Sequence, residues 1–376
     1  MNSSTRIKIC FVAPKAYPLF NPDAKNVKNP FGGSEVDLYL LAAELAKDEN
    51  FEISFIVADY GQGDVETIEN TKVIKSLDFD KNVFNGMLRI WSAMRKSDAG
   101  IYIIKTASTG VPLVAFFCRL HGRAFAYRTA SRYECDGEYA RRYPLLGRAF
   151  NRSLKSAKLV FTQNQTDREN LLRTTGVSSV LIRNGHYIER LSDSNRDIIL
   201  WAGRSDSEKR PGLFLDLAEQ FPDERFVMLC PKALNDQNYD QLVARAKTIK
   251  NLEFFPLVPF QKTSDYFRQA KVFVCTSQAE GFPNTYIQAW TNAVPVLSLD
   301  VNPDGIFDKF GCGICCNGDF ERFAKSLRFM LAENKYAQLG RNGRKYIEEY
   351  HDITKIAEEY KKLFLKIATR DNRNSS

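Results

Sequence analysis

One segment of the chain, residues 277–290, contains a carboxylate, a glycine and the start of a predicted helix in direct succession. Gly281 has no side chain, so a ligand can approach the backbone closely there. Pro283 and Asn284 begin the helix, whose free N–H groups attract anions. Glu280 precedes it and can accept hydrogen bonds from hydroxyl groups. The segment favours a ligand with both hydroxyl groups and phosphate; a turn that only caps a helix is the alternative.

A second candidate site, residues 203–211, directly follows the predicted strand 198–202. Arg204 can bind a phosphate through two parallel hydrogen bonds, and Lys209 can add a positive charge. Pro211 stands in the first turn of the next predicted helix, where proline is tolerated. A solvated charged turn is the alternative. Because ligands of parallel α/β sheets bind beyond the carboxyl ends of strands, we expect an anion site here.

The third candidate is the glycine pair Gly32 and Gly33 at the start of a predicted helix. A dinucleotide-binding fingerprint of three spaced glycines would directly follow the strand 7–13, and this sequence lacks it. A long loop, residues 14–31, leads to the glycines instead, and long loops inside compact domains are often functional. The alternative is that the glycines end the loop and Ser34 caps the helix.

These candidates need strands and helices to position them, and the sequence predicts both. Short apolar runs alternate with longer amphipathic segments, a pattern typical of βαβ units and parallel sheets. The alternation restarts after the polar stretch 192–197, which predicts a linker. We therefore predict an α/β protein with two facing Rossmann-like domains and a cleft between them, residues 1–192 and 193–352. Residues 353–376 are predicted to form a C-terminal helix that packs back on the N-terminal domain, with a frayed tail.

Composition narrows the class of protein further. A chain of 376 residues with 44% hydrophobic and 26% charged residues is ordinary for a globular protein of two domains. No apolar run approaches the roughly 20 residues that span a membrane, and the N-terminus lacks signal-peptide features. The eight cysteines are spread along the chain and lie partly in apolar runs, which indicates a reducing compartment. We expect a cytoplasmic protein, and the net charge of +8 favours anionic partners.

Taken together, these motifs resemble those of the family 4 retaining glycosyltransferases, which have the GT-B fold. The resemblance covers close to the whole chain, and its most specific piece is the segment that begins at Glu280. The matching pieces are, in chain order, Gly32-Gly33-Ser34-Glu35, Arg183-Asn184-Gly185, Gly203-Arg204 with Lys209-Arg210-Pro211, Glu280-Gly281-Phe282-Pro283-Asn284-Thr285, and Ala293-Val294-Pro295-Val296.

The resemblance implies roles for single residues. Arg204 and Lys209 would bind the diphosphate of a nucleotide-sugar donor, and Glu280 would face its sugar. The glycine pair and the backbone around Glu280 would contact the donor, with N–H groups of Phe282, Asn284 and Thr285 on sugar or phosphate oxygens. The donor-binding residues are therefore Gly32, Gly33, Gly281, Phe282, Pro283, Asn284, Thr285 and Gln288. Gln288 replaces a glutamate that usually holds the ribose hydroxyls, and the missing charge would weaken binding by about 1 kcal/mol.

The acceptor side offers fewer signals. Arg128 ends the predicted strand 124–129, and Asp136 follows it, so both are candidates for contacts with the acceptor or the donor sugar. The alternative for Asp136, as for Glu134, is that it starts the next helix at its favoured acidic end. His121 precedes this strand, and we interpret it as a loop residue.

The expected chemistry is metal-independent transfer of a hexose-type sugar with retention of anomeric configuration, as the resemblance implies. The sequence lacks the Asp-x-Asp motif that many transferases use to hold a divalent ion, whereas Arg204, Lys209 and helix N-termini could neutralise a leaving diphosphate. We expect neither a cofactor nor a metal ion. Cys312 and Cys315 form a single CxxC pair, and a structural zinc usually needs two such pairs.

The acceptor would be a glycan or a lipid-linked molecule, by resemblance in surface polysaccharide or glycolipid synthesis. A predicted helix, residues 139–156, is basic and amphipathic, so it could contact an anionic membrane at the inner face of the cytoplasmic membrane. Alternatively, its apolar stripe faces the core. Nucleic acid is not an expected partner, because charge alone supports it. A sugar-nucleotide epimerase of the same fold and a non-catalytic nucleotide-sugar-binding relative remain rival interpretations.

Overall fold

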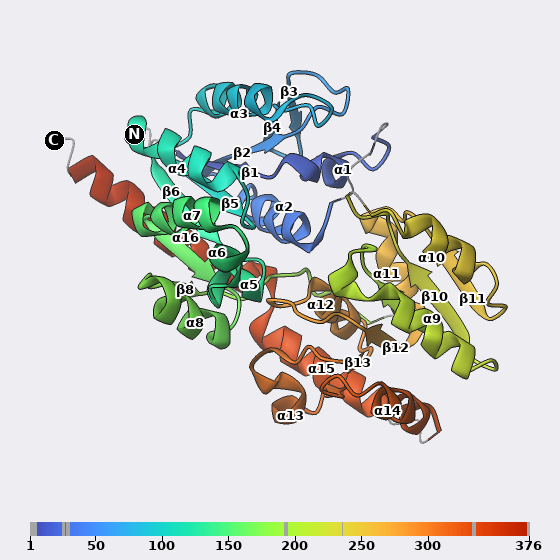
Figure 1. Ribbon diagram of the computed structural model, residues 1–376. Helices are drawn as coiled ribbons and strands as arrows, with labels where there is room; N and C mark the ends of the chain where they lie inside the picture. Colours follow the sequence, from blue (N-terminus) through green and yellow to red (C-terminus); the bar gives the residue numbers. More distant parts are fainter. Residues whose placement is uncertain are drawn as a thin grey trace. The chain divides into compact units, whose positions relative to one another are not determined.

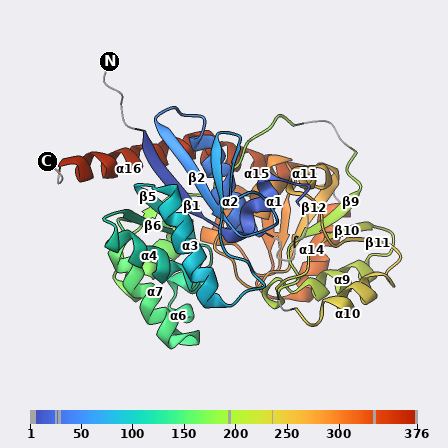
Figure 2. The same ribbon diagram turned by 90° about the horizontal axis from the view of Figure 1, so that it is seen from above.

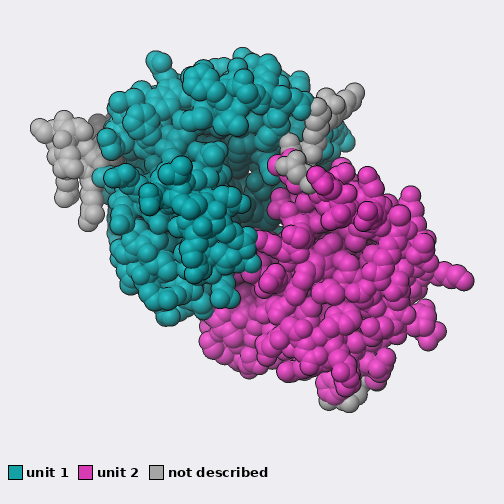
Figure 3. Space-filling view, viewed as in Figure 1, with its two compact units in different colours: residues 1–187, 353–376 teal, residues 188–352 magenta. Residues whose placement is uncertain are grey.

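The protein divides into two compact units, coloured separately in Figure 3. The first unit comprises residues 1–187 and 353–376, and the second comprises residues 188–352. The division after Tyr187 lies five residues before the predicted boundary, and part of the predicted linker, residues 192–194, lies outside the described residues. The computed structural model describes residues 6–24, 27, 31–191, 195–234, 236–332 and 336–373.

The first unit contains an eight-stranded sheet in the order β3-β4-β2-β1-β5-β6-β7-β8 (Figure 1). All neighbouring strands pair in parallel except β3 and β4. The strands are β1 Ile7–Val12, β2 Phe51–Val57, β3 Val65–Ile68, β4 Thr71–Lys75, β5 Ile101–Lys105, β6 Ala124–Arg128, β7 Leu159–Thr162 and β8 Val180–Leu181. The central strands are almost wholly buried, as expected for parallel strands covered by helices on both faces.

Helices of the first unit cover this sheet on both faces. Side chains of α3, α4 and α7 share one hydrophobic core, and these helices lie together on one side of the strands in Figure 2. Helix α16 packs against α2 and β1, and the backbone N–H of Ile353 at its start donates to the carbonyl of His186 (3.1 Å). The helices are α1 Tyr17–Phe20, α2 Gly33–Leu45, α3 Val83–Ser97, α4 Gly110–Leu120, α5 Arg132–Cys135, α6 Glu138–Arg142, α7 Pro144–Ser156, α8 Gln165–Thr175 and α16 Ile353–Arg373.

The structure differs from the sequence predictions in three places of the first unit. The predicted helix 139–156 is two helices, because Tyr143 precedes a proline and adopts a non-helical conformation, and Pro144 then starts α7. The predicted loop 14–31 begins with the short helical turns Pro14–Ala16 and α1. The antiparallel hairpin β3–β4 was missed, because its turn uses Glu69 and Asn70 with positive φ rather than a glycine.

The second unit contains a six-stranded parallel sheet in the order β11-β10-β9-β12-β13-β14. Its strands are β9 Ile198–Ala202, β10 Arg225–Leu229, β11 Leu252–Phe255, β12 Ala270–Cys275, β13 Val296–Ser298 and β14 Gly313–Cys315. Along β9, Ile199 and Trp201 pack on one face while Ile198 and Leu200 pack on the other, since successive side chains of a strand alternate. Except for the short β14, these strands were predicted.

Helices α9, α10 and α14 contribute to the core on one face of this sheet, and α11, α12, α13 and α15 contribute to the core on the other. Their bounds are α9 Pro211–Gln220, α10 Tyr239–Ala246, α11 Phe260–Gln269, α12 Asn284–Thr291, α13 Ile306–Phe310, α14 Phe320–Ala332 and α15 Tyr336–Tyr350. The predicted α/β fold with two mostly parallel sheets is thus confirmed, and the cleft between the units stays a prediction. None of the described helices is long and apolar enough to cross a membrane.

Candidate functional site

In the second unit, the two predicted loops with Arg204 and Lys209 and with Glu280 lie against each other. Strands β9 and β12 are neighbours in the sheet, so the loops after them leave the same edge side by side. Trp201 Nε1 donates to the Thr276 hydroxyl (2.9 Å), which donates to the carbonyl oxygen of Lys209 (2.6 Å). The Gln278 N–H donates to the carbonyl of Glu208 (2.8 Å). These bonds fix the loop 203–210 against the loop 276–280.

An ion pair between Lys209 and Glu280 connects the same two loops through side chains. Both side chains keep some exposure, 28% for Lys209 and 17% for Glu280. Burial alone would lower the pKa of Lys209, but the Glu280 carboxylate raises it above its ordinary value. The ammonium group is therefore charged at neutral pH and already held at the strand edge.

Arg210, next to Lys209, also holds the two loops together. Its guanidinium donates to the carbonyl oxygens of Thr276 (2.7 Å) and Ser277 (3.2 Å) and pairs with Asp300, which follows β13. Arg210 has a φ of +48°, uncommon for a residue with a side chain, and three fixed hydrogen bonds of this kind are what keep such a conformation populated. Sequence reasoning used Arg210 only as part of a motif and missed this positioning role.

Arg204 lies on the same loop, with its Nε 3.0 Å from a carboxylate oxygen of Asp206. About a third of each of these two side chains is exposed. Arg204 is also close enough to Lys209 for its charge to lower the pKa of that lysine slightly. Two cations, Arg204 and Lys209, thus stand near each other with access to solvent.

Helix α12 begins where this cluster ends. Pro283 is its N-cap residue, and Asn284 is its first residue. The buried face of the helix carries Tyr286, Ile287, Ala289 and Trp290, so Asn284, Thr285 and Gln288 lie on the partly exposed face. Phe282 is buried with its ring 4.6 Å from that of His351. This packing fixes the backbone of the Glu280–Thr285 segment, so its N–H groups are held in place before any ligand arrives.

In the first unit, Gly32 and Gly33 stand at the start of α2, as predicted. The Gly32 N–H donates to the Glu35 carboxylate (2.8 Å), and the Ser34 hydroxyl accepts a hydrogen bond from Thr106 (2.8 Å). Thr106 follows β5 and has a φ of +75°, a strained value for a β-branched residue. Such strain often marks a functional edge. No signal in the sequence pointed to Thr106.

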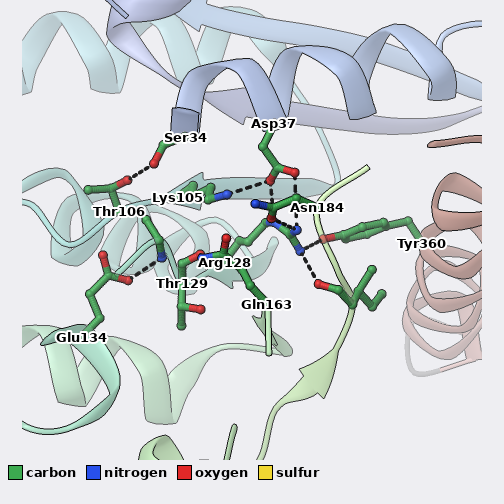
Figure 4. Close-up of polar contacts among 12 residues, drawn as sticks. Ser34, Asp37, Lys105, Thr106, Arg128, Thr129, Glu134, Gln163, Asn184 and Tyr360 are labelled. Carbon is green, nitrogen blue, oxygen red and sulfur yellow. Dashed lines mark hydrogen bonds and ion pairs between the residues drawn. The ribbon is translucent and has the colours of Figure 1, made fainter. Parts of the chain in front are cut away.

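Arg128 ends β6 as predicted, but its side chain is buried. Figure 4 shows it pointing toward Asp37, Asn184 and Tyr360. It pairs with Asp37 (2.6 Å) and donates to the side chains of Asn184 (2.7 Å) and Tyr360 (2.5 Å). Lys105 pairs with the same carboxylate of Asp37 (2.8 Å). Arg128 therefore connects α2, the segment at Asn184 and α16, and its charge lies in the interior of the first unit.

The pKa values in this buried network follow from its geometry. Burial alone would raise the pKa of Asp37, but Arg128 and Lys105 lower it below its ordinary value. Burial lowers the pKa of Lys105 to about 8, although Asp37 partly opposes that shift. Asp37 is therefore ionised at neutral pH and neutralises buried positive charge.

The acidic residues after β6 have structural partners. Glu134 is buried, and its carboxylate accepts hydrogen bonds from the N–H groups of Ala107 (3.1 Å) and Ala130 (2.9 Å) and from the Tyr127 hydroxyl (2.8 Å). Asp136 accepts from the N–H of Glu138 (2.9 Å) at the start of α6 and lies 3.4 Å from Arg132. Glu134 thereby fixes the backbone beside the strained Thr106.

Within the described ranges, no group of three or more histidine, cysteine, aspartate and glutamate side chains is placed to hold a metal ion. Cys312 and Cys316 are buried at the two ends of β14, and Cys315 is partly exposed. The expectation of a metal-independent enzyme without a cofactor stays a prediction.

Comparisons with known proteins give a sequence family for the second unit and a fold for the chain. Residues 188–346 match the sequence model of the family described as Glycosyl transferases group 1. No curated protein sequence matches the chain. Sucrose-phosphate synthase from Thermosynechococcus elongatus shares its fold with a TM-score of 0.79 at 17% identity, covering 97% of this chain and 100% of that chain.

Two further solved structures show the same likeness. WaaG, a glycosyltransferase involved in lipopolysaccharide biosynthesis, has a TM-score of 0.69 at 14% identity, covering 94% of this chain and 98% of that chain. A trehalose-6-phosphate structure from E. coli, bound with UDP-2-fluoro glucose, has a TM-score of 0.67 at 12% identity, with coverage of 95% and 98%. The two mostly parallel sheets of this chain therefore have the GT-B fold of these glycosyltransferases. The family match in the second unit and this shared fold together support a glycosyltransferase.

Proposed function

We propose that this glycosyltransferase is a retaining, metal-independent enzyme of family 4. It moves a hexose-type sugar from a nucleoside diphosphate sugar to a hydroxyl group of a glycan or lipid-linked acceptor. The observation that carries the proposal is the joined pair of loops after β9 and β12. There Arg204, Lys209 and Glu280 gather within one unit, and the loop after β12 leads directly into α12.

The charges of this site suit the departure of a diphosphate. As the bond between the anomeric carbon and the diphosphate breaks, negative charge grows on the leaving oxygen. Arg204, Lys209 and the N–H groups that begin α12 oppose that charge, and they are held in place before the reaction. The acceptor oxygen forms its bond to the anomeric carbon on the same face, and its proton passes to the leaving diphosphate oxygen. These fixed charges would take the place of a divalent ion.

The remaining residues would hold the donor and the acceptor. Glu280 would accept hydrogen bonds from the donor sugar, with Gln288 on the ribose. The backbone at Gly32 and Gly33 and at residues 281–285 would lie against the donor. On the acceptor side, Asp136 stays a proposed contact, whereas the buried Arg128 would act by positioning α2 and the strand edge.

The fold neighbours suggest a donor and a setting. The E. coli structure is bound with UDP-2-fluoro glucose, so a uridine nucleotide is the first donor to test. WaaG is involved in lipopolysaccharide biosynthesis, which supports a role in surface polysaccharide or glycolipid synthesis, in the cytoplasm at the inner face of the membrane.

The test is the thermal stability of the purified protein with uridine, guanosine, adenosine and thymidine diphosphates, with and without EDTA. A ligand at 100 times its dissociation constant adds about 2.7 kcal/mol to the free energy of unfolding. We expect one nucleotide to stabilise the protein regardless of EDTA. Arg204→Ala and Lys209→Ala should abolish the shift, and Lys325→Ala, on the exposed side of α14, should keep it. If no nucleotide raises the melting temperature, the donor site is wrong.

A second measurement separates transfer from the rival activities. The donor is incubated with and without candidate acceptors, and the products are identified. Transfer to a hydroxyl acceptor supports the proposal. Epimerisation of the donor without an acceptor would identify the protein as an epimerase. Nucleotide binding without any turnover would identify it as a binding protein.

A further inference from the structure

The N-terminal half of the outward face of α3 is apolar, whereas the outward face of a surface helix is normally polar. Phe84 and Leu88 are 71% and 57% exposed, and Met87 beside them is also exposed. Residues three and four positions apart lie on one side of a helix, so Phe84, Leu88 and the half-buried Trp91 form a continuous stripe.

Helix α4 extends this stripe. Phe116 and Leu120, one turn apart, are 56% and 61% exposed. The ring of Trp91 lies 6.0 Å from that of Phe116, so the two helices present one surface. We name it the α3–α4 patch; it consists of Phe84, Met87, Leu88, Trp91, Phe116 and Leu120. Single exposed apolar side chains are common on protein surfaces, but a contiguous patch indicates a binding surface.

The segment that contains these helices is strongly basic, even though Lys105 and Arg128 within it are buried against Asp37. Residues 81–160 contain 15 lysines and arginines and only four aspartates and glutamates, so their net charge exceeds the +8 of the whole chain. Exposed members include Arg95 of α3, Arg119 of α4, and Arg148 and Arg152 of α7. All three helices cover one face of the first sheet (Figure 2). Apolar and basic side chains thus share one face.

Helix α7, where the sequence predicted a membrane contact, supplies charges and one strongly exposed apolar side chain, Leu145 (81%). Its apolar side chains Phe150 and Leu154 are buried in the core of the first unit, so the alternative interpretation of this stripe is correct. Most of the exposed apolar side chains of this layer lie on α3 and α4 instead.

We propose that the α3–α4 patch inserts into the interface of an anionic lipid bilayer while the surrounding basic side chains contact lipid headgroups. Apolar insertion combined with Lys and Arg is the pattern of interfacial helices. A second copy of the chain fits less well, because a symmetric contact would bring two strongly basic surfaces together. A nucleic acid could contact the basic side chains, but it would not bury the apolar side chains Met87, Leu88 and Leu120. The inference rests on the proposed function, since it gives the enzyme a route to a lipid-linked acceptor.

The test is co-sedimentation of the full chain with vesicles of phosphatidylcholine alone and with added phosphatidylglycerol. We expect binding only to the anionic vesicles, weakened by salt. The variant Phe84→Ser/Leu88→Ser should bind about tenfold more weakly for each side chain removed. Arg148→Gln/Arg152→Gln should lose about fivefold for each charge. The matched control Leu234→Ser/Leu257→Ser removes two exposed leucines of the second unit and should bind like the wild type.

Three outcomes would overturn the inference: no binding to anionic vesicles, equal binding by the Phe84→Ser/Leu88→Ser variant, or equal binding to both vesicle types. In parallel, the oligomeric state of the protein without lipid is measured by sedimentation, and its binding to a single-stranded RNA is measured as well. Concentration-dependent dimers lost in the Phe84→Ser/Leu88→Ser variant, or RNA binding in place of vesicle binding, would assign the surface to another partner. Nucleotide-dependent stabilisation, measured in every variant, shows separately whether the donor site stands.

Discussion

The two units place the same residue types at the same topological position with opposite results. In the first unit, Lys105 and Arg128 end β5 and β6 and share the carboxylate of Asp37, and all three side chains are only 2–4% exposed. In the second unit, Lys209 lies beyond β9 and pairs with Glu280, and these side chains are 28% and 17% exposed. One cluster is interior and the other remains open to solvent.

The difference shows that the end of a strand does not by itself make a binding site. Arg128 donates to Asp37, Asn184, Tyr360 and the carbonyl of Ile182, so its hydrogen-bonding capacity is taken up inside the unit. Lys209 pairs with Glu280 and keeps access to solvent, so a phosphate can reach it. The comparison predicts that changes in the first cluster alter stability, whereas changes in the second alter donor binding and turnover.

The largest effect is expected for Asp37→Ala. This change leaves the charges of Arg128 and Lys105 buried without their carboxylate, and it should lower the free energy of unfolding by about 3–5 kcal/mol. Urea unfolding measures the change. The matched control is Asp98→Ala, because Asp98 also faces a lysine and an arginine but is 60% exposed. The control should lose less than about 1 kcal/mol; equal losses in the two variants would remove the distinction between the clusters.

In the second cluster, Lys209→Met should lower kcat for donor turnover by about 10²–10³-fold, the usual effect of losing one preorganised charge on a developing anion. Its melting temperature should change little, because the side chain is partly exposed and its pairing with Glu280 contributes little to stability. Steady-state kinetics and a thermal melt measure the two quantities. Lys325→Met is the control. A variant with a clearly lower melting temperature and an unchanged kcat would contradict the assignment.

The pH dependence of stability should also differ between the clusters. Because the folded pKa of Asp37 is lowered, its contribution is present above the ordinary value of about 3.9 and is lost as the pH falls through the folded pKa. The free energy of unfolding should therefore fall below about pH 4. Asp37→Asn should flatten this dependence, as measured by urea unfolding across the acid range. Glu280→Gln should leave it unchanged, and an unaltered acid slope in Asp37→Asn would exclude Asp37 as its source.

A smaller effect is expected at Gln288 on the partly exposed face of α12. Gln288→Glu adds a charged acceptor for the ribose hydroxyls, so nucleotide binding should tighten by about 1 kcal/mol, or roughly fivefold. Isothermal titration with the stabilising nucleotide measures the dissociation constant. Weaker binding would place the ribose elsewhere. Gln338→Glu on α15 is the control.

The smallest effect is expected at Thr106, the strained residue after β5. Thr106→Gly removes the steric cost of its φ of +75° but adds chain entropy to the unfolded state, so stability should change by less than about 1 kcal/mol. Thr109→Gly, at an ordinary φ of −61°, should lose about 1 kcal/mol in the same urea titration. If Thr106→Gly loses as much as Thr109→Gly, the edge of the first unit stores no strain.

Much of the fold, and the positions of the loops proposed to bind the donor, could be predicted from local sequence. The alternation of apolar runs with amphipathic segments predicts parallel sheets, and the predicted strand 198–202 has the observed bounds of β9. Positions after strands follow from chain order, so the loops with Arg204, Lys209 and Glu280 were found before their contact was known. Glycine and proline in these loops act within a few residues, which is the range that a sequence pattern covers.

Tertiary structure alone decided which charged residues stay accessible. Arg128 is buried because it meets Asp37, Asn184 and Tyr360, which lie 91, 56 and 232 positions away in the sequence. The same holds for the exposed stripe on α3 and α4, whose residues look like core until their neighbours are known. Burial depends on contacts between distant segments, and a local pattern fixes the side of an element on which a residue lies but not what covers that side.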